Sequence, residues 1–159
     1  MDLFLLLLAA TTGIYLVLAT VWDIKSREIY TFPCNVLTAL WSVYAFLKGN
    51  VDVKTMALYI GLIIALYALF NLTHIWGAGD SDLLLLFGSV YLAHMKVAFT
   101  LLDVSKLCIA LVLVLLLSMG IGFVEARRKK EHLKKTSSIA IAPGYAVVII
   151  GIMIGGFIS

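Results

Sequence analysis

The sequence contains very little charge for its length. Of its 159 residues only 13% are charged and 63% are hydrophobic, whereas an average soluble domain has about 25% charged residues. This shortage of charge excludes an ordinary soluble domain and predicts a protein embedded in a lipid bilayer. One short basic run, residues 127–135, is the exception. We interpret it as a solvated anchor beside the membrane rather than as a nucleic-acid-binding surface.

Cysteine is nearly absent as well. Cys34 and Cys108 lie far apart in apolar surroundings, and the sequence has no CxxC pair. Because the usual spacing of a zinc site is missing, we expect neither a metal nor another cofactor. Two buried thiols that pack in the core are the preferred interpretation, and a disulfide between them is the alternative.

Neither a cleavable signal peptide nor a separate soluble domain is indicated. Asp2 stands where a signal peptide carries basic residues, and the apolar run that follows is too long. We therefore expect residues 1–159 to form one all-α, membrane-embedded domain.

Long apolar runs, by contrast, are abundant. A membrane-spanning helix needs about 20 mainly apolar residues; four runs meet this need without a charge, one has a polar start and one is short. The six predicted spans are Leu3–Trp22, Ile29–Leu47, Thr55–Thr73, Leu83–Met95, Leu107–Val124 and Ile139–Ile158. Residues 95–106 are expected to form a loop or a surface helix.

Basic residues are unequally divided between the two sides of such a bundle. With the N-terminus outside, Lys25, Arg27 and the six basic residues of 127–135 lie in the cytoplasm. The basic residues left outside are Lys48, Lys54, Lys96 and Lys106. Eight against four favours this orientation, which also puts Asp23 and Asp80 at the same, cytoplasmic face.

Two aspartates follow predicted helices at that face. Asp23 follows the first helix, and Asp80 follows the third within the stretch Gly77-Ala78-Gly79-Asp80. A carboxylate at a membrane boundary is costly and therefore a candidate functional residue. Two aspartates that share one proton can hydrolyse a peptide bond, because one activates water while the other polarises the carbonyl. The glycines would break the helix before Asp80 and let a substrate strand come close.

A purely structural alternative fits the same residues. The Gly-x-Gly segment would end the third helix, and Asp80 or Ser81 would cap the fourth. Asp23 would then pair with Lys25 or Arg27 at the end of its helix.

The two motifs resemble those of the prepilin and preflagellin peptidases, a family of membrane aspartic proteases. That family carries one aspartate after its first core helix, in a pattern such as D-x-x-x-R-x-I-P-N, and a second in G-x-G-D-x-K. The matching residues here are Asp23, Arg27, Ile29, Gly77, Gly79 and Asp80. Helix order and motif placement agree too, so the resemblance covers nearly the whole chain.

The resemblance implies a function. It implies an aspartic endopeptidase, with Asp23 and Asp80 as the catalytic pair, at the cytoplasmic face of the cell membrane. Its substrates would be prepilin-like or preflagellin-like precursors with a short basic leader, and an acidic inner cluster that includes Glu28 suits such a leader. Bifunctional bacterial members also methylate the new N-terminus with an extra domain. This chain has no room for that domain between its helices, so peptidase activity alone is implied.

Two departures from the family pattern bear on the site. Tyr30-Thr31 replaces Pro-Asn, and Asp82 replaces the usual lysine. Asp82 removes a cation beside Asp80 and adds a third carboxylate. It therefore puts the local pKa values and the substrate preference in question, and it offers itself as an alternative working acid.

Other functions compete with this interpretation. Proteases of the presenilin type also use a G-x-G-D motif, but they pair it with a Tyr-Asp helix that this sequence lacks. A small ion- or proton-coupled transporter would use the aspartates as ion sites. A noncatalytic homologue would serve in pilus assembly.

Overall fold

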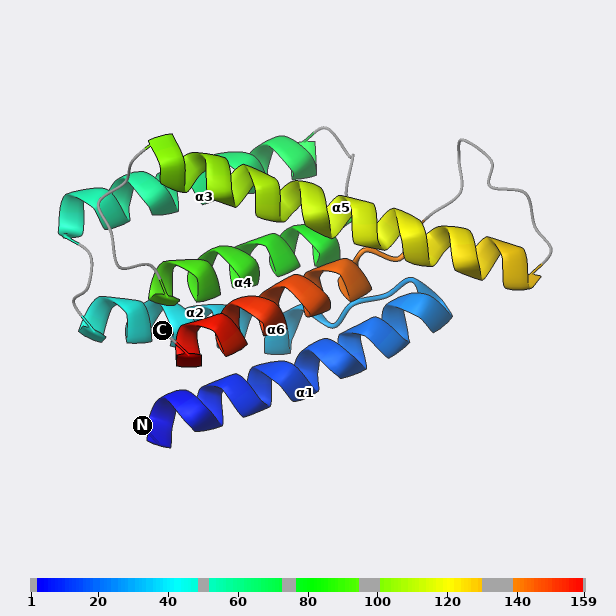
Figure 1. The fold of residues 1–159 in the computed structure, drawn as a ribbon, viewed down its shortest axis with the longest axis horizontal. Helices are drawn as coiled ribbons and strands as arrows, with labels where there is room; N and C mark the ends of the chain where they lie inside the picture. The colour runs from blue at the N-terminus through cyan, green and yellow to red at the C-terminus, as the bar shows by residue number, and fades with distance from the viewer. Residues whose placement is uncertain (1–2, 49–51, 73–76, 95–100, 130–138, 159) are drawn as a thin grey trace.

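The computed structural model describes residues 3–48, 52–72, 77–94, 101–129 and 139–158 of the chain. In these residues all regular secondary structure is helical, which confirms the all-α prediction. Successive helices run in opposite directions, so that α1 begins and α6 ends at the same end of the bundle (Figure 1). The helices are α1 (Leu3–Ser26), α2 (Thr31–Lys48), α3 (Val53–Leu72), α4 (Ala78–His94), α5 (Leu101–Lys129) and α6 (Ala142–Ile158).

Within the described residues, three helices rather than the predicted six are long and apolar enough to cross a bilayer. They are α1, α3 and the part of α5 from Val104 to Glu125. Helices α4 and α6 have 17 residues each, which is shorter than a usual span. Helix α2 has 18 residues, but Thr31, Asn35 and Lys48 lower its apolar character. The prediction of six spans therefore fails on length for two helices and on polarity for a third.

Two predicted boundaries also differ from the structure. Helix α1 continues beyond Trp22 to Ser26, so Asp23 lies within its last turns rather than after it. Helix α5 begins at Leu101, so residues 101–106 are helical, as one of the two predicted alternatives had it, but they belong to a long helix that continues to Lys129. The rest of the predicted loop, residues 95–100, lies outside the described residues.

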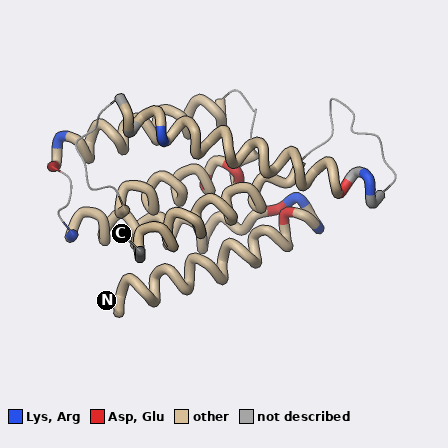
Figure 2. Tube along the Cα trace, in the orientation of Figure 1, with Lys and Arg blue, Asp and Glu red and all other residues tan. Residues whose placement is uncertain are grey.

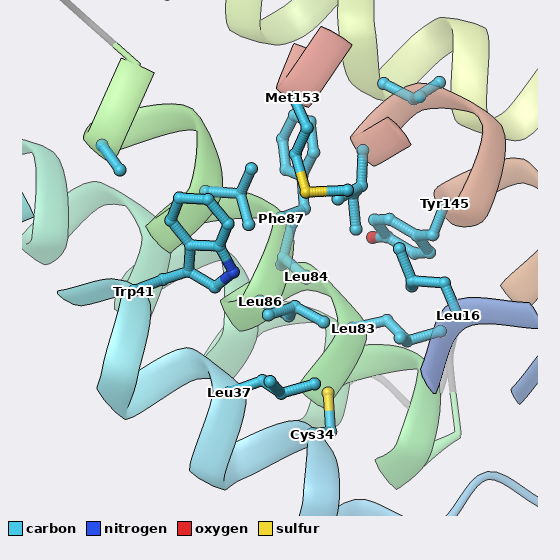
Figure 3. Close-up of a cluster of buried hydrophobic side chains, with 14 of the residues drawn as sticks. Leu16, Cys34, Leu37, Trp41, Leu83, Leu84, Leu86, Phe87, Tyr145 and Met153 are labelled. Atoms are coloured by element: carbon cyan, nitrogen blue, oxygen red, sulfur yellow. The ribbon is translucent and has the colours of Figure 1, made fainter. Parts of the chain in front are cut away.

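Helix α4 is the centre of the bundle. It packs against α2, α3 and α6, and α1 in turn packs against α2 and α6. The side chains of Leu83, Leu84, Leu86, Phe87 and Val90 are fully buried, and Figure 3 shows several of them enclosed by residues of α1, α2 and α6. A helix that is apolar on all sides is expected to be buried in this way. Because α4 contacts protein rather than lipid, its position fixes where Asp80, in its first turn, is presented.

Candidate active site

Asp23 lies near the end of α1 and is only 4% exposed. Its Oδ2 atom accepts a hydrogen bond of 2.9 Å from the backbone N–H of Ala142, the first residue of α6. A helix N-terminus carries partial positive charge and unpaired N–H groups, so it favours a carboxylate in the ionised form. The Ala142 N–H therefore offsets part of the free-energy cost of burying the Asp23 carboxylate.

The end of α1 explains how Asp23 reaches that position. Arg27 adopts a left-handed backbone conformation with φ of 58°, and its N–H bonds to the Asp23 carbonyl at 3.1 Å. This bond and conformation form an αL cap, which is rare for a residue other than glycine. The chain turns away after Ser26, which leaves Asp23 in the last complete turn, facing α6.

Asp80 is the third residue of α4. Its Oδ2 atom accepts the N–H of Gly77 at 3.2 Å, which is the half of a capping box that an acidic residue at this position supplies. The Ser81 hydroxyl donates to the Gly77 carbonyl at 3.2 Å. The structural alternative is therefore realised for Asp80, which caps its own helix. A carboxyl group that caps through one oxygen still has a second oxygen for other interactions.

The structure brings Asp23 and Asp80 together at one end of the bundle. Figure 2 shows the acidic positions at the end of α1 and at the start of α4 at this same end. Burial of the carboxyl group, and then the negative charge of Asp23, raise the pKa of Asp80 from 3.8 to about 6. The charge of Asp23 thus reaches the Asp80 carboxyl group, which holds its proton more tightly than a free carboxyl group does.

Gly79 allows this approach, for a different reason from the predicted one. Gly79 lies inside α4, so it does not break a helix before Asp80. A Cβ atom built on it would lie 2.7 Å from Cβ of Ile29, which follows α1. On Gly77 the same atom would meet only Asp80 Oδ2, at an ordinary 3.4 Å. The close contact between Gly79 and Ile29 brings the start of α4 against the segment that follows α1.

The cationic residues of the first motif do not serve as ion-pair partners for Asp23. The Nη2 atom of Arg27 bonds to Glu125 Oε2 of α5 at 2.8 Å, and Lys25 is exposed. Arg27 remains near enough for its positive charge to lower the pKa of Asp80. Among the described residues the predicted ion pair of Asp23 with Lys25 or Arg27 is therefore not formed: Arg27 bonds to Glu125 of α5 instead, although its charge still acts on Asp23.

Asp82 is turned away from the pair. Residues two apart on a helix do not share a face. Asp82 is 6% exposed, and its charge acts on Tyr15 of α1 and Cys34 of α2. Asp82 therefore occupies a separate polar position between α1, α2 and α4.

Other polar and open positions in the described residues lie apart from the two aspartates. No three His, Cys, Asp or Glu side chains of this part of the chain gather as metal ligands would. Cys34 is buried and Cys108 is exposed, and both are free thiols. Neither the disulfide nor the prediction that Cys108 is buried therefore holds. A cavity of about 230 Å³ between α2, α3 and α4 is lined mainly by apolar side chains and does not include Asp23 or Asp80.

Several residues of the site were not identified from the sequence. Glu125 precedes the basic run, and only the fold shows that it meets Arg27. Tyr145 of α6 is fully buried (Figure 3), within reach of the charge of Asp80. The backbone N–H of Ala142 cannot be recognised as a donor from its residue type, although Pro143 does mark the first turn of a helix.

Comparisons of this chain with protein-family models, with curated proteins and with solved structures give no match.

Proposed function

We propose that this protein is a membrane aspartic endopeptidase in which Asp23 and Asp80 form the acid–base pair. The observation that carries the proposal is that a buried carboxyl group, Asp23, and a half-buried one, Asp80, come from separate helices and lie close enough for the charge of Asp23 to raise the pKa of Asp80. Buried like charges cost free energy and are typical of catalytic sites. The two motifs that resemble those of prepilin and preflagellin peptidases supply the reaction class.

The surroundings of the two carboxyl groups assign their roles. Asp23 accepts the N–H of Ala142 at the start of α6, which favours the ionised state and hence the role of base. Asp80 has a pKa of about 6, so it carries the proton in mildly acidic solution and acts as the acid. Asp23 and Asp80 can take these two roles in the positions and hydrogen bonds that the structure shows.

The reaction then follows the usual course for an aspartate pair. Asp23 takes a proton from a water molecule as the water oxygen attacks the scissile carbonyl carbon, and Asp80 gives its proton to the carbonyl oxygen. When the tetrahedral intermediate collapses, the carbon–nitrogen bond breaks and the proton on Asp23 passes to the leaving nitrogen. A hydroxyl proton of the intermediate returns to Asp80, which restores the starting state.

The substrate class and the location belong to the same proposal. We infer a precursor with a short basic leader and an apolar helix, of the prepilin or preflagellin kind, which is cut at the cytoplasmic face of the cell membrane. Glu28 is exposed five residues after Asp23 and provides a negative charge that suits a basic leader. The three shorter helices would lie in the membrane together with the three long ones, since α4 is covered by α2, α3 and α6.

Cleavage of a prepilin-like precursor by the purified protein in detergent tests the proposal. Asp23→Asn and Asp80→Asn remove one carboxyl group each at nearly constant volume, and each is expected to lower cleavage by about 10³-fold or more. Asp82→Asn is the matched control, because it makes the same change two residues from Asp80 on another face of α4. Undiminished cleavage by either Asp23→Asn or Asp80→Asn would reject the pair, and an inactive native chain would favour a noncatalytic role in assembly.

A further inference from the structure

We propose that Ser118 and Gly144 are positioning residues for Asp23, because they hold the start of α6 against α5 where the Ala142 N–H meets Asp23 Oδ2. The effect on catalysis rests on the proposed function. The contact itself does not, so it can be tested separately.

Ser118 connects α5 to the residue immediately before α6. It is 2% exposed, and its hydroxyl oxygen lies 2.8 Å from the Val114 carbonyl in its own helix and 3.2 Å from the Ile141 carbonyl. The Ile141 carbonyl also accepts the N–H of Gly144 at 3.0 Å. The peptide group between Ile141 and Ala142 is thus held from both sides: its carbonyl faces Ser118 and its N–H faces Asp23.

Gly144 determines how closely α5 and α6 approach. A Cβ atom on this residue would collide with the Ser118 hydroxyl and with the Val114 carbonyl. Gly122 makes a similar contact one turn further along α5, where a Cβ atom would lie 2.8 Å from Ile139. Small residues at such places let two helices pack closely in a membrane. An alanine at position 144 must therefore push the start of α6 away from α5, and the Ala142 N–H moves with it.

The charged groups around Asp23 determine how that movement changes its ionisation. They are Arg27, which directly follows α1, Glu125 in α5 and Asp80 in α4. The N-terminus of α6 supplies the Ala142 donor. Displacing α6 removes this donor, while Arg27, Glu125 and Asp80 are not part of α6 and stay in place. The ionised form of Asp23 then loses a hydrogen bond, so Asp23 should retain its proton to a higher pH.

The test is a titration of the Asp23 carboxyl carbon by ¹³C NMR in micelles, together with the pH profile of precursor cleavage. Gly144→Ala and Ser118→Ala are expected to raise the pH of half-ionisation of Asp23 by about one unit. Cleavage on the acid side of the profile should fall by about tenfold, because less Asp23 is available as a base. Gly151→Ala is the matched control in α6, since a Cβ atom there meets nothing within 4 Å.

The outcomes separate this inference from the proposed function. An unchanged titration of Asp23 in both variants would overturn it, and so would lost cleavage without a shift of the acid limb, which indicates only a structural role. Ser118→Ala adds no volume and keeps the test decisive if Gly144→Ala does not fold. If the native chain cleaves no precursor, the proposed function fails while the titration still decides whether Ser118 and Gly144 position Asp23.

Discussion

The two ends of the helical bundle bury polar groups in different ways. At the end opposite Asp23 and Asp80, the indole N–H of Trp41 donates to the Thr12 hydroxyl at 2.9 Å. The His94 ring lies 5.4 Å from the ring of Trp41 and bonds to a carbonyl of its own helix. Each of these polar groups has a neighbour that satisfies it. At the Asp23 end, Asp23 and Asp80 each accept one backbone N–H, but the negative charge of Asp23 also acts on Asp80, and Arg27 is bonded to Glu125.

The difference separates a stabilising arrangement from a functional one. A neutral hydrogen bond between two buried side chains stabilises the fold modestly. A buried carboxyl group beside a half-buried one lowers stability, so the presence of the two calls for a reason other than stability. If this is correct, substitutions at the Asp23 end should change activity, and substitutions at the Trp41 end should change the free energy of unfolding.

Outside the aspartate pair itself, the largest effect is expected at Gly79. In Gly79→Ala the new methyl group would collide with Ile29, 2.7 Å away, and move the start of α4 from the end of α1. We expect cleavage to fall by about 100-fold, because a displacement of about 1 Å at a reacting group costs that much. Gly77→Ala is the matched control, since its methyl group makes only an ordinary contact. Equal rates for the two variants in a single-turnover assay would contradict the assigned role of Gly79.

Gly79 also shows how far sequence reasoning reaches. Apolar runs and motif spacing predicted all-α structure and helices close to those observed, because helix formation depends on local pattern. The number of spans was overestimated, because the shortness of α4 is compensated by tertiary burial that a hydropathy pattern does not reveal. The sequence identified Gly79 and Ile29 as motif residues but did not predict that they touch each other. It also did not predict that Glu125 pairs with Arg27. Contacts between distant segments follow from packing and have no local signature.

The pH dependence of cleavage should show the coupling at the Asp23 end. Asp80 must be protonated to act as the acid, and its pKa is about 6. The rate should therefore fall as pH rises through 6, by about tenfold for each further unit. In Asp23→Asn, the removal of one negative charge should lower the pKa of Asp80 below about 6. A ¹³C NMR titration of the Asp80 carboxyl carbon measures this pKa even in an inactive variant. A pKa of Asp80 that does not change would show that the two groups are not coupled.

A smaller effect, on stability, is expected at the Trp41 end. Thr12→Val removes the acceptor for the Trp41 indole, while Trp41→Phe leaves the Thr12 hydroxyl bonded to the Leu8 carbonyl. We expect Thr12→Val to lower the free energy of unfolding by about 1 kcal/mol, with cleavage unchanged. Unfolding in mixed micelles measures this, and the double variant gives the coupling energy of the pair. A loss of cleavage in Thr12→Val would break the distinction between the two ends.

Little effect on cleavage is expected at Asp82 either, even though it is a buried carboxyl group close to Asp80 in sequence. Asp82→Asn should cleave within about threefold of the native rate, because Asp82 faces Tyr15 and Cys34 rather than Asp23.

The effect of Asp82→Asn should appear in stability instead. Burial raises the pKa of Asp82 above 3.8, so the folded native chain binds this proton more tightly than the unfolded chain does. Stability from this group is complete below pH 3.8 and is lost as pH rises through the folded pKa. Asparagine has no such dependence, so the free energy of unfolding of Asp82→Asn relative to the native chain should increase from pH 4 to pH 8. A difference that does not vary with pH would mean that Asp82 titrates as an exposed carboxylate, and the position between α1, α2 and α4 would then be assigned incorrectly.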